Sequence, residues 1–265
     1  MSFKQIIRWA GSKKKLVPVL LDNMPREYER YVEPFCGSAC LFFELNPNKA
    51  LLCDINDELV NVFNLIKTDI GFYDDLISIP ATKEEYYRIR DLNVADMSEK
   101  ERAVRFLFLN RYCFNGVYRT NKAGKFNVPW GTKTGNIPSK SVFEYASSLL
   151  SKADVKSLDY KKTAEEVLPN DFVYLDPPYS KSGKFTGEYG VGSLTSDETP
   201  NIIEMLDKFD SQNTKFMLSY VKCEKFIDSL PNHYKVKELT VKRHVAGFKT
   251  TWGSAQEILV KNYGR

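Results

Sequence analysis

The sequence predicts an α/β fold, in which a parallel sheet flanked by helices is interrupted by a mostly helical insertion containing a hairpin. Three observations predict it. A strand, a small-residue turn, a helix, a second strand and an acid follow one another between Tyr31 and Asp54, as in the first half of a nucleotide-binding sheet. The pattern resumes with the apolar run Phe172–Leu175. The stretch between these halves first has helical periodicity and then loses it, so we assign it to an insertion.

In the N-terminal half, apolar runs bounded by turn residues predict strands at 31–35 and 50–53, with a helix starting at 40–45 between them. Asp54 ends the second strand. Asn56 or Asp57 then caps a helix that runs to Lys67, because a short polar side chain can accept from the unpaired amides of a first turn.

The insertion is expected to alternate helices with a long irregular stretch. We place the sheet domain at 1–59 and 151–265, and the insertion at 60–150. Helices are expected at 83–93, 98–110 and 140–151. Ser98 and Glu101 have the spacing of a capping box, which marks the start of the second helix. From 111 to 138, Gly, Asn, Pro and aromatic residues dominate, as in loops and hairpins.

The C-terminal half continues the α/β pattern. Strands are expected at 155–159, 172–175 and 215–220, followed by a closing hairpin of 236–241 with 257–260. The Gly/Ser-rich stretch 180–196 is expected as a loop. Pro200 suits the first turn of a helix, where its missing amide is not needed.

The composition is that of an ordinary globular protein. Apolar residues make up 43% and charged residues 27%, which is too apolar for a disordered chain. No apolar run approaches the roughly 20 residues of a membrane span, and the N-terminus lacks a signal-peptide core. The five cysteines form no CxxC pair and have no His at metal spacing. We therefore expect a reduced, cytoplasmic setting, no membrane and no metal.

The positive charge is unevenly placed. The net charge is only +4, yet the window from Arg105 to Phe143 has no Asp or Glu, seven basic residues and eight aromatic rings. The rest of the chain has 31 basic residues against 34 acidic ones. Basic residues interleaved with aromatics and asparagines are typical of phosphate and base contact, although a solvated charged face is an alternative. The distribution therefore favours nucleic-acid binding by the insertion.

The sharpest motif is Asp176-Pro177-Pro178-Tyr179, directly after the apolar strand. The two prolines end the strand and remove two amide donors, which leaves nearby carbonyls free to accept. This set suits a flat substrate with an exocyclic amino group: Asp176 and the Pro177 carbonyl accept its hydrogens, and Tyr179 stacks on its ring. An ordinary strand exit with a surface proline turn is the alternative.

The turn around Gly37 suits a nucleoside. It has one glycine where a dinucleotide fingerprint has three, so a pyrophosphate cradle is not supported. Asp54 lies 21 residues beyond Glu33, close to the roughly 20-residue offset at which a carboxylate reaches ribose hydroxyls. We therefore expect an adenosine ligand, with a packing glycine and a capping aspartate as the alternative.

These segments together resemble a family, the Dam-type (D12 class) DNA adenine-N6 methyltransferases. The match runs in order from about residue 6 to residue 261 and includes the late segment 257–263. Residues 9–13 are similar to the family's WAGGK motif, 34–38 to its PFxGS turn, 114–121 and 126–131 to its target-recognition segment, and 176–179 to its DPPY. DPPY alone also admits cytosine-N4 and RNA methyltransferases, whereas the ordered set is much more specific.

The resemblance implies a Rossmann-like, metal-independent enzyme that uses S-adenosylmethionine, yields S-adenosylhomocysteine and methylates a flipped adenine in double-stranded DNA. The catalytic residues it implies are Asp176, Pro177, Pro178 and Tyr179. The cofactor contacts it implies are Trp9, Lys13, Asp54 and Asp176, with Phe35 and Gly37 shaping the pocket and Leu158 and Asp159 beside the cofactor adenine.

For DNA contact, the resemblance points to the insertion. Arg119 is the expected reader of a guanine, and Arg8 stands where relatives carry a basic residue that touches DNA. The other DNA-contacting residues expected are Asn115, Val117, Asn121, Lys122, Asn127, Pro129 and Lys133. The target is expected to be GATC or a close variant, because Thr132 stands where relatives often have Arg. Ser12 and Ala39 each replace a glycine of the family pattern.

Two other functions stay open at this point. One is the same chemistry on another acceptor, an adenine in RNA or the N4 position of cytosine. The other is a catalytically silent DNA-binding relative, against which the intact Asp176–Tyr179 motif argues. We expect a monomer, and the sequence leaves open whether a cognate restriction endonuclease accompanies it.

Overall fold

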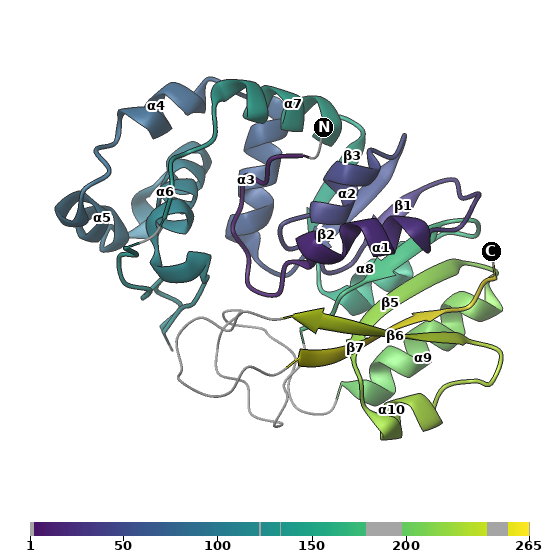
Figure 1. Ribbon diagram of the computed structural model, residues 1–265. Coiled ribbons are helices and arrows are strands. Elements are labelled where there is room, and N and C mark those ends of the chain that lie inside the picture. Colours follow the sequence, from purple (N-terminus) through teal and green to yellow (C-terminus); the bar gives the residue numbers. More distant parts are fainter. Residues whose placement is uncertain (1–2, 122, 133, 179–197, 243–253, 265) are drawn as a thin grey trace.

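The computed structural model describes residues 3–121, 123–132, 134–178, 198–242 and 254–264, without the side chains of 240–242, 254 and 255. Its centre is a seven-stranded sheet in the order β3-β2-β1-β4-β5-β7-β6. The strands are β1 (Tyr31–Glu33), β2 (Ala50–Asp54), β3 (Ala153–Ser157), β4 (Phe172–Leu175), β5 (Lys215–Val221), β6 (Lys235–Lys242) and β7 (Ser254–Lys261). The first five are parallel, and β7 pairs antiparallel with both β5 and β6 (Figure 1). The predicted α/β class and closing hairpin are confirmed.

The strand order places a crevice at the centre of the sheet. From β1 the chain moves outward to β2 and β3, then returns to the other side of β1 to form β4 and β5. At such a reversal, the loops beyond the carboxyl ends of neighbouring strands turn away from each other and leave room for a ligand. The segments after Glu33 and after Leu175 therefore meet at one edge of the sheet.

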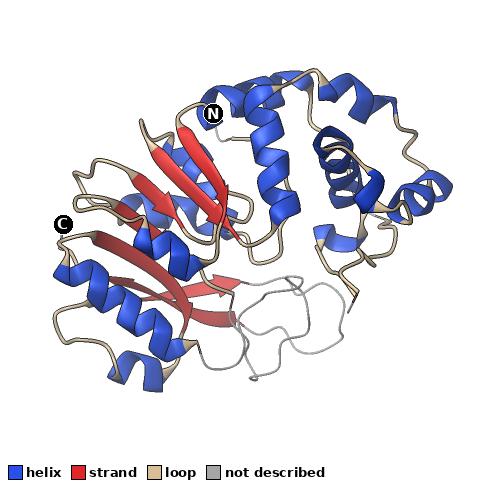
Figure 2. Cartoon of the chain, turned by 180° about the vertical axis from the view of Figure 1, so that it is seen from behind, coloured by secondary structure: helices blue, strands red, loops and turns tan. Residues whose placement is uncertain are grey.

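Helices cover both faces of the sheet (Figure 2). On one face lie α1 (Val17–Asp22), which follows the short helix η1 (Lys13–Leu16), and α2 (Cys40–Leu45), α3 (Asp57–Thr68) and α7 (Lys140–Leu150). On the other lie α8 (Tyr160–Glu165), α9 (Thr199–Ser211) and α10 (Glu224–Asp228). Alternate strand residues serve the two cores: Val173 and Leu175 face the α9 side, whereas Phe172 and Tyr174 face the α3 side.

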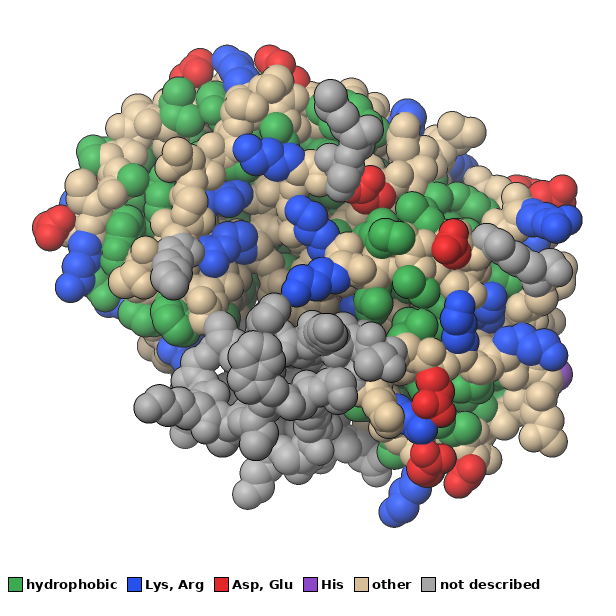
Figure 3. Space-filling model, viewed as in Figure 1, with side chains coloured by type: hydrophobic (Ala, Val, Ile, Leu, Met, Phe, Trp, Pro, Cys, Tyr) green, Lys and Arg blue, Asp and Glu red, His purple; other side chains and the backbone are tan. Residues whose placement is uncertain are grey.

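The predicted insertion lies beside the sheet, with its helices on the far side of α3 (Figure 1). It contains α4 (Phe72–Ser78), α5 (Lys83–Arg90), η2 (Val94–Asp96), α6 (Glu99–Tyr112) and η3 (Phe114–Gly116). The expected boundary at residue 60 falls inside α3, which packs against β3, α6 and α7, and one apolar core runs from the sheet into α6. In the same view, several Lys and Arg side chains lie close together in the middle of the face (Figure 3).

The helices with predicted caps begin where expected, and one helix ends earlier than predicted. The Asn56 side chain accepts from the Leu59 amide and begins α3. The helix expected at 83–93 ends at Arg90, because Asn93 starts a separate 3-10 turn by accepting from the Ala95 amide. Within the described ranges, no helix has the length and apolar character needed to cross a membrane.

The capping box of α6 leads to a stability prediction. The Ser98 hydroxyl accepts from the Glu101 amide at 3.3 Å, while the Glu101 carboxylate accepts from the Ser98 amide at 2.8 Å. Ser98→Ala is therefore expected to lower the free energy of unfolding by about 1 kcal/mol in urea denaturation. The matched control is Ser148→Ala, since that exposed hydroxyl only donates to the Tyr145 carbonyl within α7. Equal effects of the two substitutions would contradict the assigned cap.

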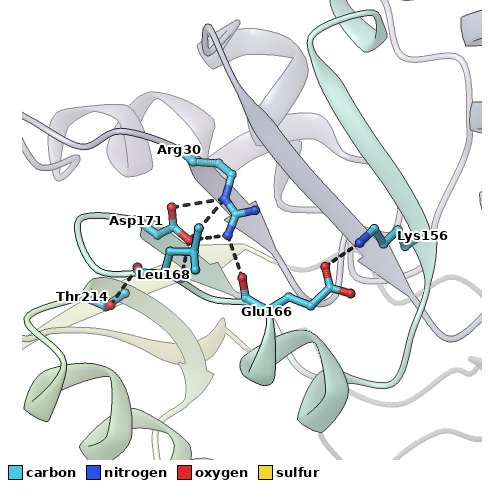
Figure 4. A network of polar contacts seen from close by, with 6 residues as sticks. All are labelled: Arg30, Lys156, Glu166, Leu168, Asp171 and Thr214. Atoms are coloured by element: carbon cyan, nitrogen blue, oxygen red, sulfur yellow. Dashed lines mark hydrogen bonds and ion pairs between the residues drawn. The ribbon is translucent and has the colours of Figure 1, made fainter.

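At the edge opposite the crevice, an ion pair joins β1 to β4 (Figure 4). Arg30 Nη2 lies 2.6 Å from Asp171 Oδ2 and donates to the Glu166 carbonyl at 2.7 Å. Asp171 is 2% exposed and also accepts from the Leu168 amide. Because a buried carboxylate needs this full set of donors, the pair fixes the amino ends of the two central strands.

Candidate active site and nucleic-acid interface

A pocket opens at the carboxyl ends of β1, β2 and β4. It encloses about 1020 Å³ counted with its open mouth. It is lined by 9–13, 33–38, 40, 54, 55, 158–160, 174 and 176–178. This lining includes every predicted cofactor residue, together with Pro177 and Pro178; Tyr179 lies outside the described residues.

The turn after β1 holds Asp54 at the pocket wall. Gly37 has a φ of +46° and donates its amide to Asp54 Oδ2 at 3.0 Å. The Asn56 amide donates to the other oxygen at 3.0 Å. A side chain at Gly37 would lie 2.8 Å from the Trp9 ring, so only glycine fits both the backbone and the space. Burial raises the pKa of Asp54, and these backbone hydrogen bonds oppose the rise.

Lys13 and Asp176, which the sequence assigned to one site, form a direct ion pair. Lys13 Nζ lies 2.6 Å from Asp176 Oδ1 and 3.9 Å from Glu257 Oε2. Lys13 is 6% exposed and Glu257 is 1% exposed. Glu257 was missed by sequence reasoning. The sequence does carry a signal for it: an acid lies on the predicted closing strand, on the same face as the apolar Leu259. A buried acid on such a face needs a polar partner.

Glu33 was also missed, since the sequence argument used it only to count the offset to Asp54. It ends β1, is 3% exposed and lines the pocket. The Tyr31 hydroxyl donates to Glu33 Oε1, whereas Oε2 is buried without a hydrogen-bond partner among the described residues. Burial raises the pKa of Glu33 to about 8. Because buried polar atoms are normally hydrogen-bonded, an oxygen without a partner on a residue that lines a pocket points to a ligand that donates to it.

Beside Leu158 and Asp159, the wall of the pocket is largely apolar and partly aromatic. The rings of Phe35 and Tyr160 stack at 5.3 Å. Ile55, 47% exposed, lines the same pocket. The Asp159 carboxylate accepts from the Lys161 amide at 2.8 Å, so it caps α8 while its residue borders the pocket. This wall can enclose a flat base.

Residues 113–131, here called the recognition segment, form a hairpin-like loop at the end of α6. Antiparallel bridges pair Cys113 with Trp130 and Thr120 with Phe126. Arg119 is exposed, and its Nε donates to Asn127 Oδ1 at 2.9 Å, which fixes the guanidinium direction. Asn127 in turn donates its amide to the Arg119 carbonyl at 3.1 Å.

The other predicted DNA contacts have varied settings. Asn115 is exposed with a left-handed φ of 55°, Pro129 is exposed and Val117 is half-buried. The Asn121 side chain accepts from the Ala123 and Lys125 amides and so shapes the turn. Lys122 and Lys133 lie outside the described residues.

Some of the positive charge in the 105–143 window serves the fold, which corrects the expectation from charge placement alone. Arg105 is 8% exposed and donates to the Ile89 and Arg90 carbonyls. Arg111 donates to the Ile6 carbonyl, and Arg8 donates to the carbonyls of Arg111 and Cys113. These guanidinium groups bond to carbonyls at the end of α5, at Ile6 and at the end of α6, so the exposed basic surface is smaller than the sequence count.

Comparison with known proteins identifies the family. The model of the D12 class N6 adenine-specific DNA methyltransferases matches residues 9–245. A type II methyltransferase of Lactococcus lactis subsp. cremoris is 32% identical over all of this chain and 97% of its own length. A type II methyltransferase of Methanocaldococcus jannaschii is 31% identical over 99% of this chain and 100% of its own length.

A third relative carries the activity in its name. The DNA adenine methylase of Haemophilus influenzae is 28% identical over 93% of this chain and 89% of its own length. The resemblance seen in the ordered motifs is therefore confirmed. This chain belongs to the D12 class of N6 adenine-specific DNA methyltransferases.

Proposed function

We propose that this protein flips a target adenine out of double-stranded DNA, within GATC or a close variant, and transfers a methyl group from S-adenosylmethionine to its exocyclic amino group. The observation that carries the proposal is the meeting of Asp176, Pro177 and Pro178 with Gly37 and Asp54 in one pocket. An acceptor for an amino group and an acceptor for ribose hydroxyls then lie side by side.

The pocket fits this cofactor on three counts. Glu33 Oε2, buried without a hydrogen-bond partner among the described residues, suits the cationic amino-acid end. The Asp54 carboxylate suits ribose hydroxyls, and the wall of Phe35, Ile55 and Tyr160 suits the adenine. S-adenosylmethionine supplies a methyl group activated by a positively charged sulfur. We propose that Trp9, Lys13, Leu158 and Asp159 complete this site.

The residues at the end of β4 would position the acceptor. The Asp176 carboxylate and the Pro177 carbonyl accept the two hydrogens of the adenine amino group, which turns the nitrogen lone pair toward the methyl group. Lys13 pairs with the Asp176 carboxylate at 2.6 Å and holds it in place. Flipping costs a few kcal/mol, and orientation of the reactants contributes roughly 7–11 kcal/mol in return. Tyr179 is proposed to stack on the flipped base.

The recognition segment would hold the duplex. We propose that Arg119 reads a guanine, with Asn115, Val117, Asn121, Asn127 and Pro129 nearby and Arg8, Lys122 and Lys133 close to the phosphates. Phe114 is an exposed ring, 41% accessible, beside the Cys113–Trp130 bridge at the base of this segment. An exposed ring within a DNA surface can insert between base pairs, so Phe114 is proposed to fill the space that the flipped adenine leaves.

Expression in a host that lacks adenine methylation, followed by methylation-sensitive sequencing, tests the proposal. Methylated adenine at GATC or a one-base variant is expected. Incubation of the purified protein with labelled S-adenosylmethionine and duplex DNA, single-stranded RNA or a duplex of G·C pairs only then separates the alternatives by nucleoside analysis. Label found only in N4-methylcytosine or only in RNA would overturn it.

Cofactor binding is expected to depend on pH through Glu33. Because burial raises the pKa of Glu33 to about 8, this carboxyl is mostly neutral near pH 7 and ionised near pH 9. Only the ionised form attracts a cation, so the affinity for S-adenosylmethionine relative to a variant without this carboxylate should rise with pH, by about tenfold across that interval. Calorimetric titration at several pH values measures it.

Glu33→Gln is the matched variant for that titration. Its side chain does not ionise, whereas the amino group of the ligand titrates identically with either protein. The difference between the two pH profiles therefore isolates Glu33. Parallel profiles for wild type and variant would contradict the assigned role.

A further inference from the structure

A stack of three aromatic rings lies between the pocket and the recognition segment. The Tyr118 ring is sandwiched by Trp9, at a centroid distance of 5.8 Å and an interplanar angle of 24°, and by Phe106, at 5.3 Å and 28°. Trp9 lines the pocket, whereas Tyr118 directly precedes Arg119 in the chain. One side chain therefore contacts both functional regions.

The Tyr118 hydroxyl makes a second connection to the pocket. It lies near the side chain of Asn56, which opposes the rise that burial causes in the pKa of Tyr118. The backbone amide of Asn56 donates to Asp54 Oδ1 at 3.0 Å. Tyr118 thus adjoins two loops that contribute to the pocket lining, through its ring at Trp9 and through its hydroxyl near Asn56, which follows Asp54 and Ile55.

Both ends of this arrangement are tightly held. At the pocket end, the Trp9 ring lies so close to Gly37 that a methyl group there would be 2.8 Å away. The Asn110 side chain bonds both the amide and the carbonyl of Arg8, next to Trp9. At the other end, the Tyr118 ring packs on Phe126, whose bridge with Thr120 closes the loop around Arg119. Because packed rings do not deform freely, a shift of Trp9 displaces Tyr118.

We propose that Tyr118 is a positioning residue that makes guanine reading by Arg119 depend on the filling of the cofactor pocket. The inference rests on the proposed function, since it takes the pocket and the recognition segment as the cofactor and DNA sites. A ligand against Trp9 favours one position of the stack, and the stack sets the backbone direction at Arg119. By linkage, cognate DNA must then tighten cofactor binding by the same factor.

The test is a coupling measurement that involves no turnover. The dissociation constant of a cognate duplex is measured without ligand and with saturating S-adenosylhomocysteine. Their ratio is the coupling factor, expected at about 5- to 150-fold for the wild type. Tyr118→Leu removes both the ring and the hydroxyl and should bring the coupling factor within about twofold of unity. Tyr118→Phe keeps the stack but removes the hydroxyl beside Asn56 and should give an intermediate value.

Tyr87→Leu is the matched control. Tyr87 is another packed ring of the insertion, in contact with Tyr86 and Arg90 on α5 and away from the pocket lining. It should keep the wild-type coupling factor. The same reduction in Tyr87→Leu as in Tyr118→Leu would mean a general loss of packing and would overturn the inference.

The remaining outcomes separate the inference from the proposed function. An unchanged coupling factor in Tyr118→Leu overturns the inference. If that variant does not fold, Tyr118→Phe decides, and an unchanged factor there overturns it. A wild type that methylates adenine but shows no coupling also overturns the inference alone, because methylation of host DNA establishes the proposed function independently.

Discussion

Replacement of Asp176 by alanine is expected to slow adenine methylation at least about a thousandfold, with salt-dependent DNA binding close to that of the wild type. Asp176 follows β4 directly and lines the pocket, and it is not part of the recognition segment. In the proposed mechanism, it is the charged acceptor for the adenine amino group. Its loss removes a contact that strengthens as positive charge develops on that nitrogen.

Two companion variants make the Asp176 experiment decisive. Asp176→Asn keeps the shape but loses the charge that pairs with Lys13 at 2.6 Å, so it should be nearly as slow as alanine if charge matters. Asp154→Asn removes an exposed carboxylate from β3 and should leave turnover unchanged. Single-turnover rates with labelled cofactor, beside filter-binding of duplex DNA, give both readouts. Turnover of Asp176→Ala within about tenfold of the wild type would refute the assignment.

The parts of the site that lie at strand ends were predictable from sequence. Asp54 and Asp176 each follow a short apolar run, and a parallel sheet brings the carboxyl ends of its strands to one edge. Gly37 was predictable for the same reason, because a lone glycine between strand and helix marks close approach of backbone and ligand. These signals are local in the chain, so no tertiary information was needed.

The parts that depend on distant pairing were not predictable. Glu257 meets Lys13 only because β7 inserts antiparallel beside β5, and no pattern within 254–261 names that partner. Arg105 belongs to the basic window, yet it lies in α6, and its guanidinium donates hydrogen bonds to the last carbonyls of α5. A count of charges does not distinguish a phosphate-binding arginine from one that caps a buried helix end.

Arg119→Ala is expected to reduce the discrimination for one guanine of the target site. Methylation of a site that differs from the cognate one only by replacement of this guanine should stay nearly unchanged. A bidentate arginine contact discriminates by roughly 1–3 kcal/mol, so the preference for the cognate site should fall about 10- to 100-fold. The exposed guanidinium is aimed by the Asn127 side chain at 2.9 Å. Asn127→Ala should therefore lower the preference less than Arg119→Ala, since it frees the arginine without removing it.

The shape of the loss separates base reading from simple charge. Arg119→Lys keeps the charge but not the fork of donors, so it should lose most of the discrimination while binding DNA as tightly as the wild type. Lys125→Ala removes a neighbouring exposed charge and should weaken the binding of all DNA sequences equally. The dependence of the binding constant on salt concentration should also become less steep. Ratios of kcat/KM on paired duplexes measure both effects. If Arg119→Lys kept the full preference, positive charge alone would account for the contact, and guanine would have to be read elsewhere in the recognition segment.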